Sequence, residues 1–288
     1  MTNNTSVQTK VIPLVSFPKS GNTWVRFLLA NALKRNVNCS INYKNINHYT
    51  PAGTLQGYDA NLLTSNAPCF LKAHQTFNIT KEWSFKFDKV IYIVRDPLDM
   101  LWSYYHFINA QKPDRYRSLG GFTHDYDRYC GHWGHHVISW VDNDQGKDIL
   151  LVKYEELKKR PECILKRILA FSNIPVADAR INHAVESSCF QNMKTFEGGR
   201  AFMKAKDEAY NFVRSAVAGE GRLMIPDKCA RIFFSHSCNR DVANRYQYYY
   251  ITPSAMQRGI YCCSHRFHKI YSRIKPRLSK PSKNGAIS

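Results

Sequence analysis

The stretch VIPLVSFPKSGNTWVRFLLANALKR, residues 11–35, decides the fold. An apolar, β-branched run over 11–15 predicts a strand that ends at Phe17, and the apolar spacing from Thr23 onward predicts a helix. Between them, residues 19–23 supply one cation, three polar side chains and a glycine at the start of that helix. Because the free N–H groups at a helix N-terminus favour anions, this strand–loop–helix unit is predicted to bind phosphate.

A plainer interpretation of the loop stays open at this point. It would be an ordinary turn, with Ser20 or Asn22 capping the helix and Lys19 as a solvated surface charge. The loop also lacks the Walker pattern, because it has no Gly-Lys-Ser/Thr triplet with a glycine upstream. A nucleotide kinase is therefore a less favoured alternative, and it predicts ATP turnover that depends on Mg²⁺.

The rest of the chain repeats the alternation of strand and helix. Strands are predicted over 68–73, 89–94 and 148–152, and helices over 98–109, 132–140 and 161–171. Asp96 followed by Pro97 is a typical helix start. Residues 36–66 and 110–130 are polar, and we expect loops there. The order of elements predicts an α/β fold, an open parallel sheet flanked by helices on both faces.

Four polar residues follow the four predicted strands: Lys19, His74, Arg95 and Tyr154. Parallel strands end at the same edge of a sheet, and open α/β sheets bind ligands beyond that edge. We therefore expect these four side chains to converge on one site. For Arg95 the competing interpretation is a salt bridge to Asp96 or Asp99, and for His74 it is a purely structural role.

Length and charge indicate the domain organisation. The chain has 288 residues, with 41 Lys+Arg against 22 Asp+Glu and a net charge of +19. This length fits one α/β domain of roughly 250 residues plus tails. We expect a disordered lead over 1–10, a single domain over 11–258 and a basic tail over 259–288. The tail has apolar residues at helical spacing between its cations, which suits an anionic surface or packing on the domain.

Composition also bounds the class of protein. The positive charge admits a second class of function, binding of nucleic acid or of an anionic membrane surface. Nine cysteines at irregular spacing, without a CxxC pair, are expected to be reduced thiols. His132, His135 and His136 cluster, but no carboxylate or thiol at a suitable spacing completes a zinc site. No leader-like N-terminus and no run of about 18 apolar residues occur, so we expect a soluble cytoplasmic protein.

Two motifs resemble those of one known family. Residues 16–24, SFPKSGNTW, resemble the 5′-phosphosulfate loop of the sulfotransferases that use 3′-phosphoadenosine 5′-phosphosulfate (PAPS). Residues 93–107, IVRDPLDMLWSYYHF, resemble the 3′-phosphate segment of the same family. Further elements resemble the family in the same order: Lys72-x-His74, residues 131–140, Tyr154 with Glu155, and residues 188–194. This resemblance covers about residues 11–222 and implies a P-loop-like nucleotide-binding architecture.

One family signature departs from the usual pattern. The family's RKGxxGDWK element is present only as RSAVAGEGR, residues 214–222. Arg214 and Gly219 match it, whereas Ser215 and Ala216 do not. We therefore expect the hold on the donor's 3′-phosphate to be weaker or to be supplied from elsewhere. The dimerisation motif of many cytosolic members is not recognisable, which leaves the oligomeric state open.

The resemblance implies a role for each matching residue. Lys19, His74 and Ser103 are the expected catalytic residues: Lys19 would neutralise the leaving oxygen, His74 would act as general base, and Ser103 would bind the 3′-phosphate or modulate Lys19. Trp24 and Phe190 would sandwich the adenine. The residues expected to bind the donor are Lys19, Ser20, Gly21, Asn22, Thr23, Trp24, Arg95, Ser103, Tyr154, Ser188, Phe190, Arg214 and Gly219.

These roles imply a sulfotransferase that moves a sulfuryl group from PAPS to a hydroxyl or amine of a small-molecule or glycan acceptor. The product PAP is expected, without a metal and without specific nucleic-acid binding, and the tail is expected to contact anionic surfaces weakly. Residues 36–66, 75–85, 108–130 and 195–212 would line the acceptor pocket. Their many Tyr and His residues fit polar aromatic, sugar and guanidinium-bearing acceptors equally well.

Overall fold

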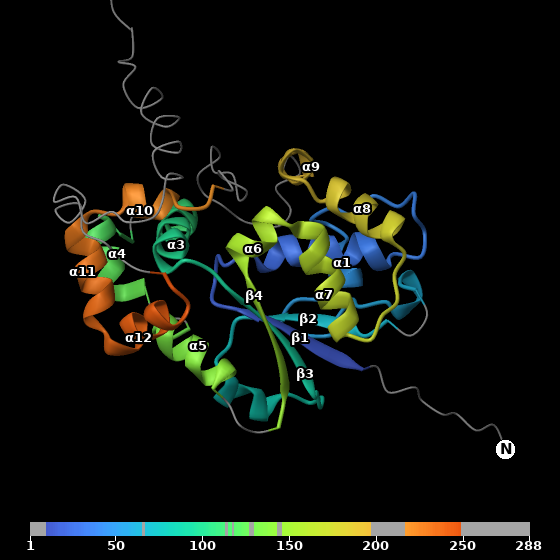
Figure 1. The fold of residues 1–288 in the computed structure, drawn as a ribbon, viewed down its shortest axis with the longest axis horizontal. Helices are drawn as coiled ribbons and strands as arrows, with labels where there is room; N and C mark the ends of the chain where they lie inside the picture. The colour runs from blue at the N-terminus through green and yellow to red at the C-terminus, as the bar shows by residue number, and fades with distance from the viewer. Residues whose placement is uncertain are drawn as a thin grey trace, which may run out of the picture. The chain divides into compact units, whose positions relative to one another are not determined.

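The computed structural model of the chain describes residues 10–64, 67–112, 115–116, 118–126, 130–142, 146–196 and 217–248. At its centre is a four-stranded, all-parallel sheet in the order β2-β1-β3-β4 (Figure 1). The strands are β1 (Val11–Ser16), β2 (Cys69–Ala73), β3 (Lys89–Val94) and β4 (Asp148–Lys153). The parallel sheet predicted from the strand and helix alternation is confirmed.

Strand β1 lies inside the sheet. Leu14 pairs with Lys72 of β2 on one side and with Ile91 of β3 on the other. Every residue of β1 is buried, as expected for a central strand that is covered on both faces. The loop that follows β1 therefore leaves the sheet at its middle, with the ends of β2 and β3 beside it.

Helices cover both faces of the sheet, as the sequence predicted. Ile91 and Ile93 of β3 join the apolar core on one face, whereas Tyr92 between them bonds His136 on the other face. The first face carries α1 (Asn22–Leu33), α2 (Ile46–Tyr49), α6 (Tyr154–Lys159), α7 (Pro161–Phe171), α8 (Asp178–Ser187) and α9 (Phe190–Thr195). Helix α1 lies against α8.

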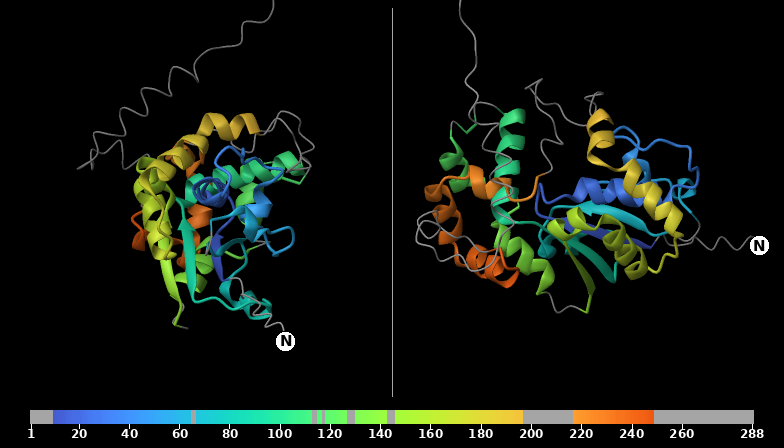
Figure 2. Two further views of the ribbon diagram at one scale, coloured as in Figure 1. Left: turned by 90° about the vertical axis from the view of Figure 1, so that its right-hand side faces the viewer. Right: turned by 45° about the horizontal axis from the view of Figure 1, so that its top comes forward.

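The second group of helices lies on the other side of the molecule (Figures 1 and 2). It comprises α3 (Pro97–Gln111), α4 (Leu119–Asp125), α5 (Trp133–Val141), α10 (Glu220–Met224), α11 (Asp227–Ser235) and α12 (Ser237–Arg245). The last three, drawn in orange, pack on the first three: α10 on α3, α11 on α4 and α12 on α5. Residues 217–248 thereby return to the helix that follows β3.

Helix α3 begins as the sequence predicted and extends two residues further, to Gln111. Asp96 is its N-cap, and its carboxylate accepts from the amides of Leu98 and Asp99 at 2.9 and 3.4 Å. The prediction of a loop over 110–130 was wrong for 119–125, which form α4. Two glycines in that segment lower its helix propensity, but Ser118 caps the helix and Phe122 is buried.

The polar stretch after α1 is more ordered than the predicted long loops. It contains α2 and the 3₁₀ turn η1 (Ala60–Leu62), and a second 3₁₀ turn, η2 (Phe77–Glu82), follows β2. Ile41, Tyr43, Ile46 and Tyr49 are buried in the core under α1. Burial of these scattered apolar residues in the core therefore holds the segment in place, and no local helix or strand periodicity would have revealed this.

The predicted domain limits remain predictions. The lead over 1–9, the boundary at 258 and the tail over 259–288 lie outside the described residues. Within the described ranges, no helix is long and apolar enough to cross a membrane. The seven cysteines in those ranges are all free thiols.

Candidate active site

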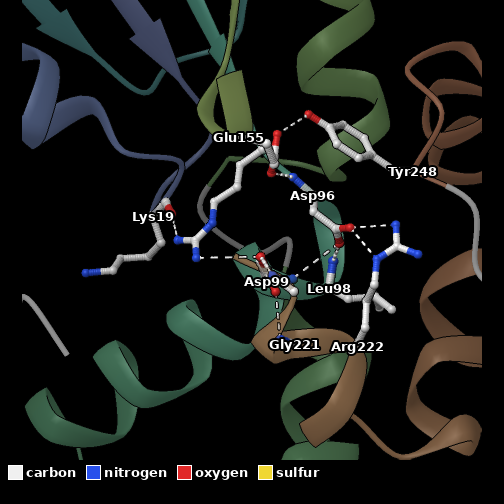
Figure 3. Close-up of polar contacts among 10 residues, drawn as sticks. Lys19, Asp96, Leu98, Asp99, Glu155, Gly221, Arg222 and Tyr248 are labelled. Atoms are coloured by element: carbon white, nitrogen blue, oxygen red, sulfur yellow. Dashed lines mark hydrogen bonds and ion pairs between the residues drawn. The ribbon is translucent and has the colours of Figure 1, made fainter. Parts of the chain in front are cut away.

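The loop between β1 and α1 has a backbone that ordinary turns rarely use. Lys19 and Gly21 both have positive φ angles, 67° and 99°. The carbonyl of Lys19 accepts a hydrogen bond of 3.0 Å from Nη1 of Arg95, the first residue after β3 (Figure 3). The ends of two neighbouring strands are therefore tied together directly at the predicted phosphate loop.

Gly21 is required by a close approach as well as by its φ angle. A Cβ atom at this position would lie 2.5 Å from the Tyr154 ring, which begins α6 after β4. No side chain fits there without moving the ring. The loop therefore rests on Tyr154 and brings the third strand end into the same site.

The plainer interpretation, a turn capped by Ser20 or Asn22, does not describe this loop. The N-cap of α1 is Gly21, and no side chain caps the helix. Asn22 instead donates from Nδ2 back to the carbonyl of Leu14 at 2.8 Å. The hydroxyl of Ser20 is buried and has no hydrogen-bond partner within the described part of the chain. A buried, unsatisfied hydroxyl at a helix N-terminus suits an anionic ligand.

The Lys19 ammonium lies 4.7 Å from the centre of the Phe107 ring, on α3. Figure 3 shows its side chain directed away from Asp99. Ser103 lies four residues from both Asp99 and Phe107, so these three share one face of α3. Ser103 is partly exposed on that face. Ser103 therefore lies one turn from the ring that the Lys19 ammonium contacts, and its predicted role stays a prediction.

His74 follows β2 and is half-buried. Its Nδ1 lies 2.7 Å from the carbonyl oxygen of Ser16, the last residue of β1. Since a carbonyl only accepts, Nδ1 carries the proton and Nε2 carries the lone pair. Burial lowers the pKa of His74 well below its ordinary value, and the charge of Lys72 lowers it further. The imidazole is therefore neutral near pH 7.

A buried histidine on α5 supports the His74 backbone. Nε2 of His136 lies 3.0 Å from the carbonyl oxygen of His74, and Nδ1 lies 2.7 Å from the hydroxyl of Tyr92. Trp140, one turn further along α5, donates to the carbonyl of Gln75 at 2.9 Å. The segment after β2 is therefore fixed by side chains from α5.

Two basic side chains lie on the elements next to the loop, one on α1 and one on β2. Arg26 is fully buried, and burial lowers its pKa to about 10. It donates to the carbonyl of Thr50 at 2.9 Å and to Oδ1 of Asn47 at 2.6 Å. Burial, with the charge of Arg26 as a second cause, lowers the pKa of Lys72 to about 7. A pKa near 7 leaves Lys72 only partly charged at neutral pH, and the Arg26 guanidinium is held by Thr50 and Asn47.

Arg95 meets structural partners on three sides. Besides the Lys19 carbonyl, its guanidinium lies 4.5 Å from the centre of the Tyr154 ring. Nη2 lies 3.9 Å from the carboxylate of Asp99, which is beyond hydrogen-bond range. The salt bridge that competed with phosphate binding is thus present only as a Coulombic contact. Nε is buried without a partner among the described residues.

The predicted adenine end lies at α1, α6 and the start of α9. Nε1 of Trp24 donates to the carbonyl of Ser188 at 3.0 Å, and the Trp24 ring meets the Tyr154 ring edge-on. The Ser188 hydroxyl is fully buried and accepts from Asn31 at 3.1 Å. Phe190, the first residue of α9, is partly exposed. The structure brings the Ser188 backbone to Trp24, while the Ser188 side chain is committed to α1.

The return segment 217–224 docks on the first turn of α3 (Figure 3). The amides of Gly219 and Gly221 each donate to one oxygen of Asp99 at 2.7 Å. Arg222 donates to Asp96 at 2.6 Å, so its guanidinium serves the N-cap of α3. Arg214, the other expected member of this signature, lies outside the described residues.

The sequence analysis gave three residues of this site little or no role. Asp99 entered it only as a competing partner of Arg95, Lys72 only as part of a motif, and Arg26 not at all. Burial alone distinguishes Arg26, which no local pattern reveals. Among the described residues, no group of three His, Cys, Asp or Glu side chains is arranged to hold a metal.

Comparisons of the sequence with known proteins point to one family. The family profile described as "Sulfotransferase domain" matches residues 9–233. A WSCD family member of Aedes aegypti is 31% identical over 173 residues, which cover 57% of this chain and 51% of that protein. Sulfotransferase 1 family member D1 of Mus musculus is 26% identical over 230 residues, covering 73% and 76%. The chain thus spans about half of the first relative and three quarters of the second.

A solved structure has the same fold. Mouse sulfotransferase SULT7A1, complexed with PAP, superimposes with a TM-score of 0.59 at 23% identity, covering 83% of this chain and 89% of that chain. The predicted P-loop-like fold is thereby confirmed. Since the family profile spans most of the chain, from the strand before the phosphate loop to α11, this chain belongs to the sulfotransferase family.

Proposed function

We propose that this sulfotransferase moves a sulfuryl group from PAPS to a hydroxyl or amine of a small-molecule acceptor, with His74 as general base. One observation carries the proposal. The Nδ1–H of His74 bonds the carbonyl of Ser16, so a neutral imidazole with its Nε2 lone pair stands where β1 enters the phosphate loop. A neutral base beside an anion-binding loop is the arrangement that sulfuryl transfer needs.

The residues of the loop fit the donor. The buried Ser20 hydroxyl lacks a partner among the described residues, and Gly21, with its positive φ angle, lets the loop rest on Tyr154. Both favour a phosphate at the N-terminus of α1. Arg95 with its unpartnered Nε suits the 3′-phosphate, and Trp24 with Phe190 suits the base. When bound, PAPS supplies an activated sulfuryl group, and the protein positions and neutralises.

The proposed step is a single displacement at sulfur. Nε2 of His74 accepts the proton of the acceptor's O–H or N–H as that oxygen or nitrogen bonds to sulfur. The bond from sulfur to the bridging oxygen breaks, and its electron pair stays on the phosphate. Lys19 offsets the charge that develops on that oxygen, and Ser103, on the α3 face beside Phe107, assists.

The proposal commits to a small-molecule acceptor because a partly exposed aromatic ring lies beside the proposed catalytic lysine. Phe107 on α3 lies beneath the Lys19 ammonium, 4.7 Å from it. Such a ring suits an acceptor with an apolar or aromatic body and one nucleophilic group.

A transfer assay tests the proposal. The purified chain is incubated with PAPS carrying a labelled sulfuryl group and with phenols, alcohols, amines and sugars, with and without EDTA. We expect label on at least one hydroxyl or amine, and transfer about 10²- to 10³-fold slower with the Lys19→Ala variant. PAP binding without transfer to any acceptor class would reject the small-molecule acceptor, and Mg²⁺-dependent ATP turnover in place of transfer would reject the sulfotransfer reaction.

A further inference from the structure

Asp99 is a buried carboxylate with an unusual set of partners. Its side chain is fully buried, and its two oxygens accept from two backbone amides, Gly219 and Gly221, at 2.7 Å each. Those amides belong to a segment 120 residues further along the chain. A buried carboxylate normally needs a cation or several hydrogen bonds, and here backbone donors provide most of them.

The docked segment has little freedom to sit elsewhere. A Cβ at Gly221 would overlap the backbone carbonyl of Leu98, so α10 is in direct contact with the first turn of α3. Gly219 has a φ of 88°, which turns its amide toward Asp99. Nε and Nη2 of Arg222 both lie 2.6 Å from Asp96 and complete the docking at the outer side.

The same carboxylate faces Arg95. Nη2 of Arg95 is 3.9 Å from Asp99, while Nη1 holds the Lys19 carbonyl. Asp99 thus contacts both the return segment and the guanidinium proposed to bind the 3′-phosphate. This matters in a chain whose Ser215 and Ala216 replace the basic and glycine residues expected in that signature.

We propose that Asp99 is a positioning residue of the donor site, which locks the return segment onto α3 and sets the direction of Arg95. The inference rests on the proposed use of PAPS. Asp99 touches neither donor nor acceptor in this role, so it acts on donor affinity and leaves the chemical step alone. When the ground state and the transition state lose the same donor-binding energy, KM rises and kcat is unchanged.

The charge state of Asp99 gives the role a pH signature. Burial, and then the nearby charge of Asp96, raise the pKa of Asp99 to about 6, against the opposing effects of Arg95 and the two amides. The charged and titratable groups around it are Arg95 and Asp96 beside α3, Tyr154 on α6 and Arg222 on α10. Above pH 6 the carboxylate accepts both N–H groups, and below it protonation weakens the lock.

Asp99→Asn is the direct test. An amide presents one acceptor oxygen and one N–H₂ group, so one glycine amide would face another donor. We expect the Kd for PAP, measured by calorimetry, and the KM for PAPS to rise about tenfold or more at pH 7.5. At saturating PAPS, kcat should stay within about twofold of wild type. Asp178→Asn, which removes an exposed partner of Lys166, is the matched control and should change neither.

The pH dependence separates positioning from a general loss of structure. The phosphate groups of PAP titrate in the same pH range as Asp99. We therefore compare, at each pH, the ratio of the Kd of the variant to the Kd of wild type. The ratio should be largest above pH 7 and should approach one near pH 5, where wild-type Asp99 is protonated. A merely destabilised variant would show no such convergence.

The outcomes decide between the two proposals. If wild type binds PAP and Asp99→Asn binds equally well at pH 7.5, the role of Asp99 is overturned while the proposed function stands. If wild type does not bind PAP, the proposed function fails and this inference fails with it. Should Asp99→Asn not fold, Gly221→Ala displaces the segment with the carboxylate intact, and an unchanged Kd for PAP in that variant would equally overturn the lock.

Discussion

His136 donates a hydrogen bond from Nε2 to the backbone carbonyl oxygen of His74 at 3.0 Å and accepts one at Nδ1 from the hydroxyl of Tyr92 at 2.7 Å. The tautomer follows from the carbonyl, which only accepts. His136 is fully buried, and burial lowers its pKa to about 4. One neutral histidine thereby holds the backbone of the histidine proposed as base.

Protonation of His136 should destabilise the fold in acid. Its pKa is about 4 when folded and about 6.5 when unfolded, so the unfolded chain binds more protons between these values. The contribution is complete above pH 6.5 and is lost as pH falls toward 4, by about 3 kcal/mol. Urea unfolding at a series of pH values should show a shallower decline for His136→Gln than for wild type.

The matched control is His48→Asn. His48 also places Nδ1 2.7 Å from a backbone carbonyl, that of Gly57, but it is exposed. Its replacement controls for the loss of a histidine side chain that bonds a backbone carbonyl. Equal slopes for wild type and His136→Gln would contradict a neutral, buried His136.

Lys19→Ala should lower kcat for sulfuryl transfer by about 10²- to 10³-fold, because the developing charge on the leaving oxygen loses its cation. The unfolding free energy should change little, since the ammonium lies over the Phe107 ring rather than in the core. Initial rates at saturating PAPS measure the effect. Lys44→Ala, at an exposed lysine on the polar stretch, is the control, and a Lys19→Ala enzyme as active as that control would refute the assignment.

His74→Asn should lower kcat by about 10²- to 10⁴-fold, as expected for loss of a general base. In wild type the acid limb of the kcat profile should lie below pH 6.5, because burial keeps the pKa of His74 low. The base is neutral, and active, above that limb. A wild-type acid limb centred at or above pH 6.5 would argue against His74.

Lys72→Met should move that acid limb to higher pH. Burial is the largest cause of the lowered pKa of His74, and the positive charge of Lys72 is the second. Removing the charge removes the second cause only, so the shift should be modest and upward. The kcat profile of the variant measures it, and a limb that stays in place or moves down would contradict the electrostatic coupling.

Gly21→Ala should cost both stability and donor affinity. Its φ of 99° disfavours any side chain by about 1 kcal/mol, and its Cβ would press on the Tyr154 ring. Gly53→Ala is the matched control, because Gly53 also has a positive φ, 76°, yet a Cβ there meets nothing within 4 Å. Calorimetric titration with PAP should show a loss for Gly21→Ala alone. Equal losses of PAP affinity in Gly21→Ala and Gly53→Ala would mean that backbone strain, and not the contact with the Tyr154 ring, causes the effect.

The fold was predictable wherever one local pattern decides the structure. The run 89–94, apolar after Lys89, matches β3 residue for residue, and Asp96 with Pro97 marks the start of α3. Residues 119–125 were missed because two glycines hide a helix that a serine cap and a buried phenylalanine stabilise. Local propensity is a weak guide when burial outweighs it.

The site was predictable only in part. Strand ends identified Lys19, His74, Arg95 and Tyr154 as neighbours, since parallel topology alone brings them to one edge. The partners of Asp99 and Asp96 lie 120 to 126 residues away in the sequence and leave no local signal. The pairing of the two aspartates with these partners depends on where the return segment packs, which the local sequence does not encode.

The inner position of β1 also orders the folding of the chain during synthesis. Its neighbours are β2, which begins at Cys69, and β3, which begins at Lys89, so a nascent chain that ends before β3 leaves one edge of a strand that is buried in the fold without hydrogen-bond partners. Closing such long loops is slow compared with forming a local helix. On the ribosome, β1 is therefore expected to be exposed to chaperones until β3 has been synthesised.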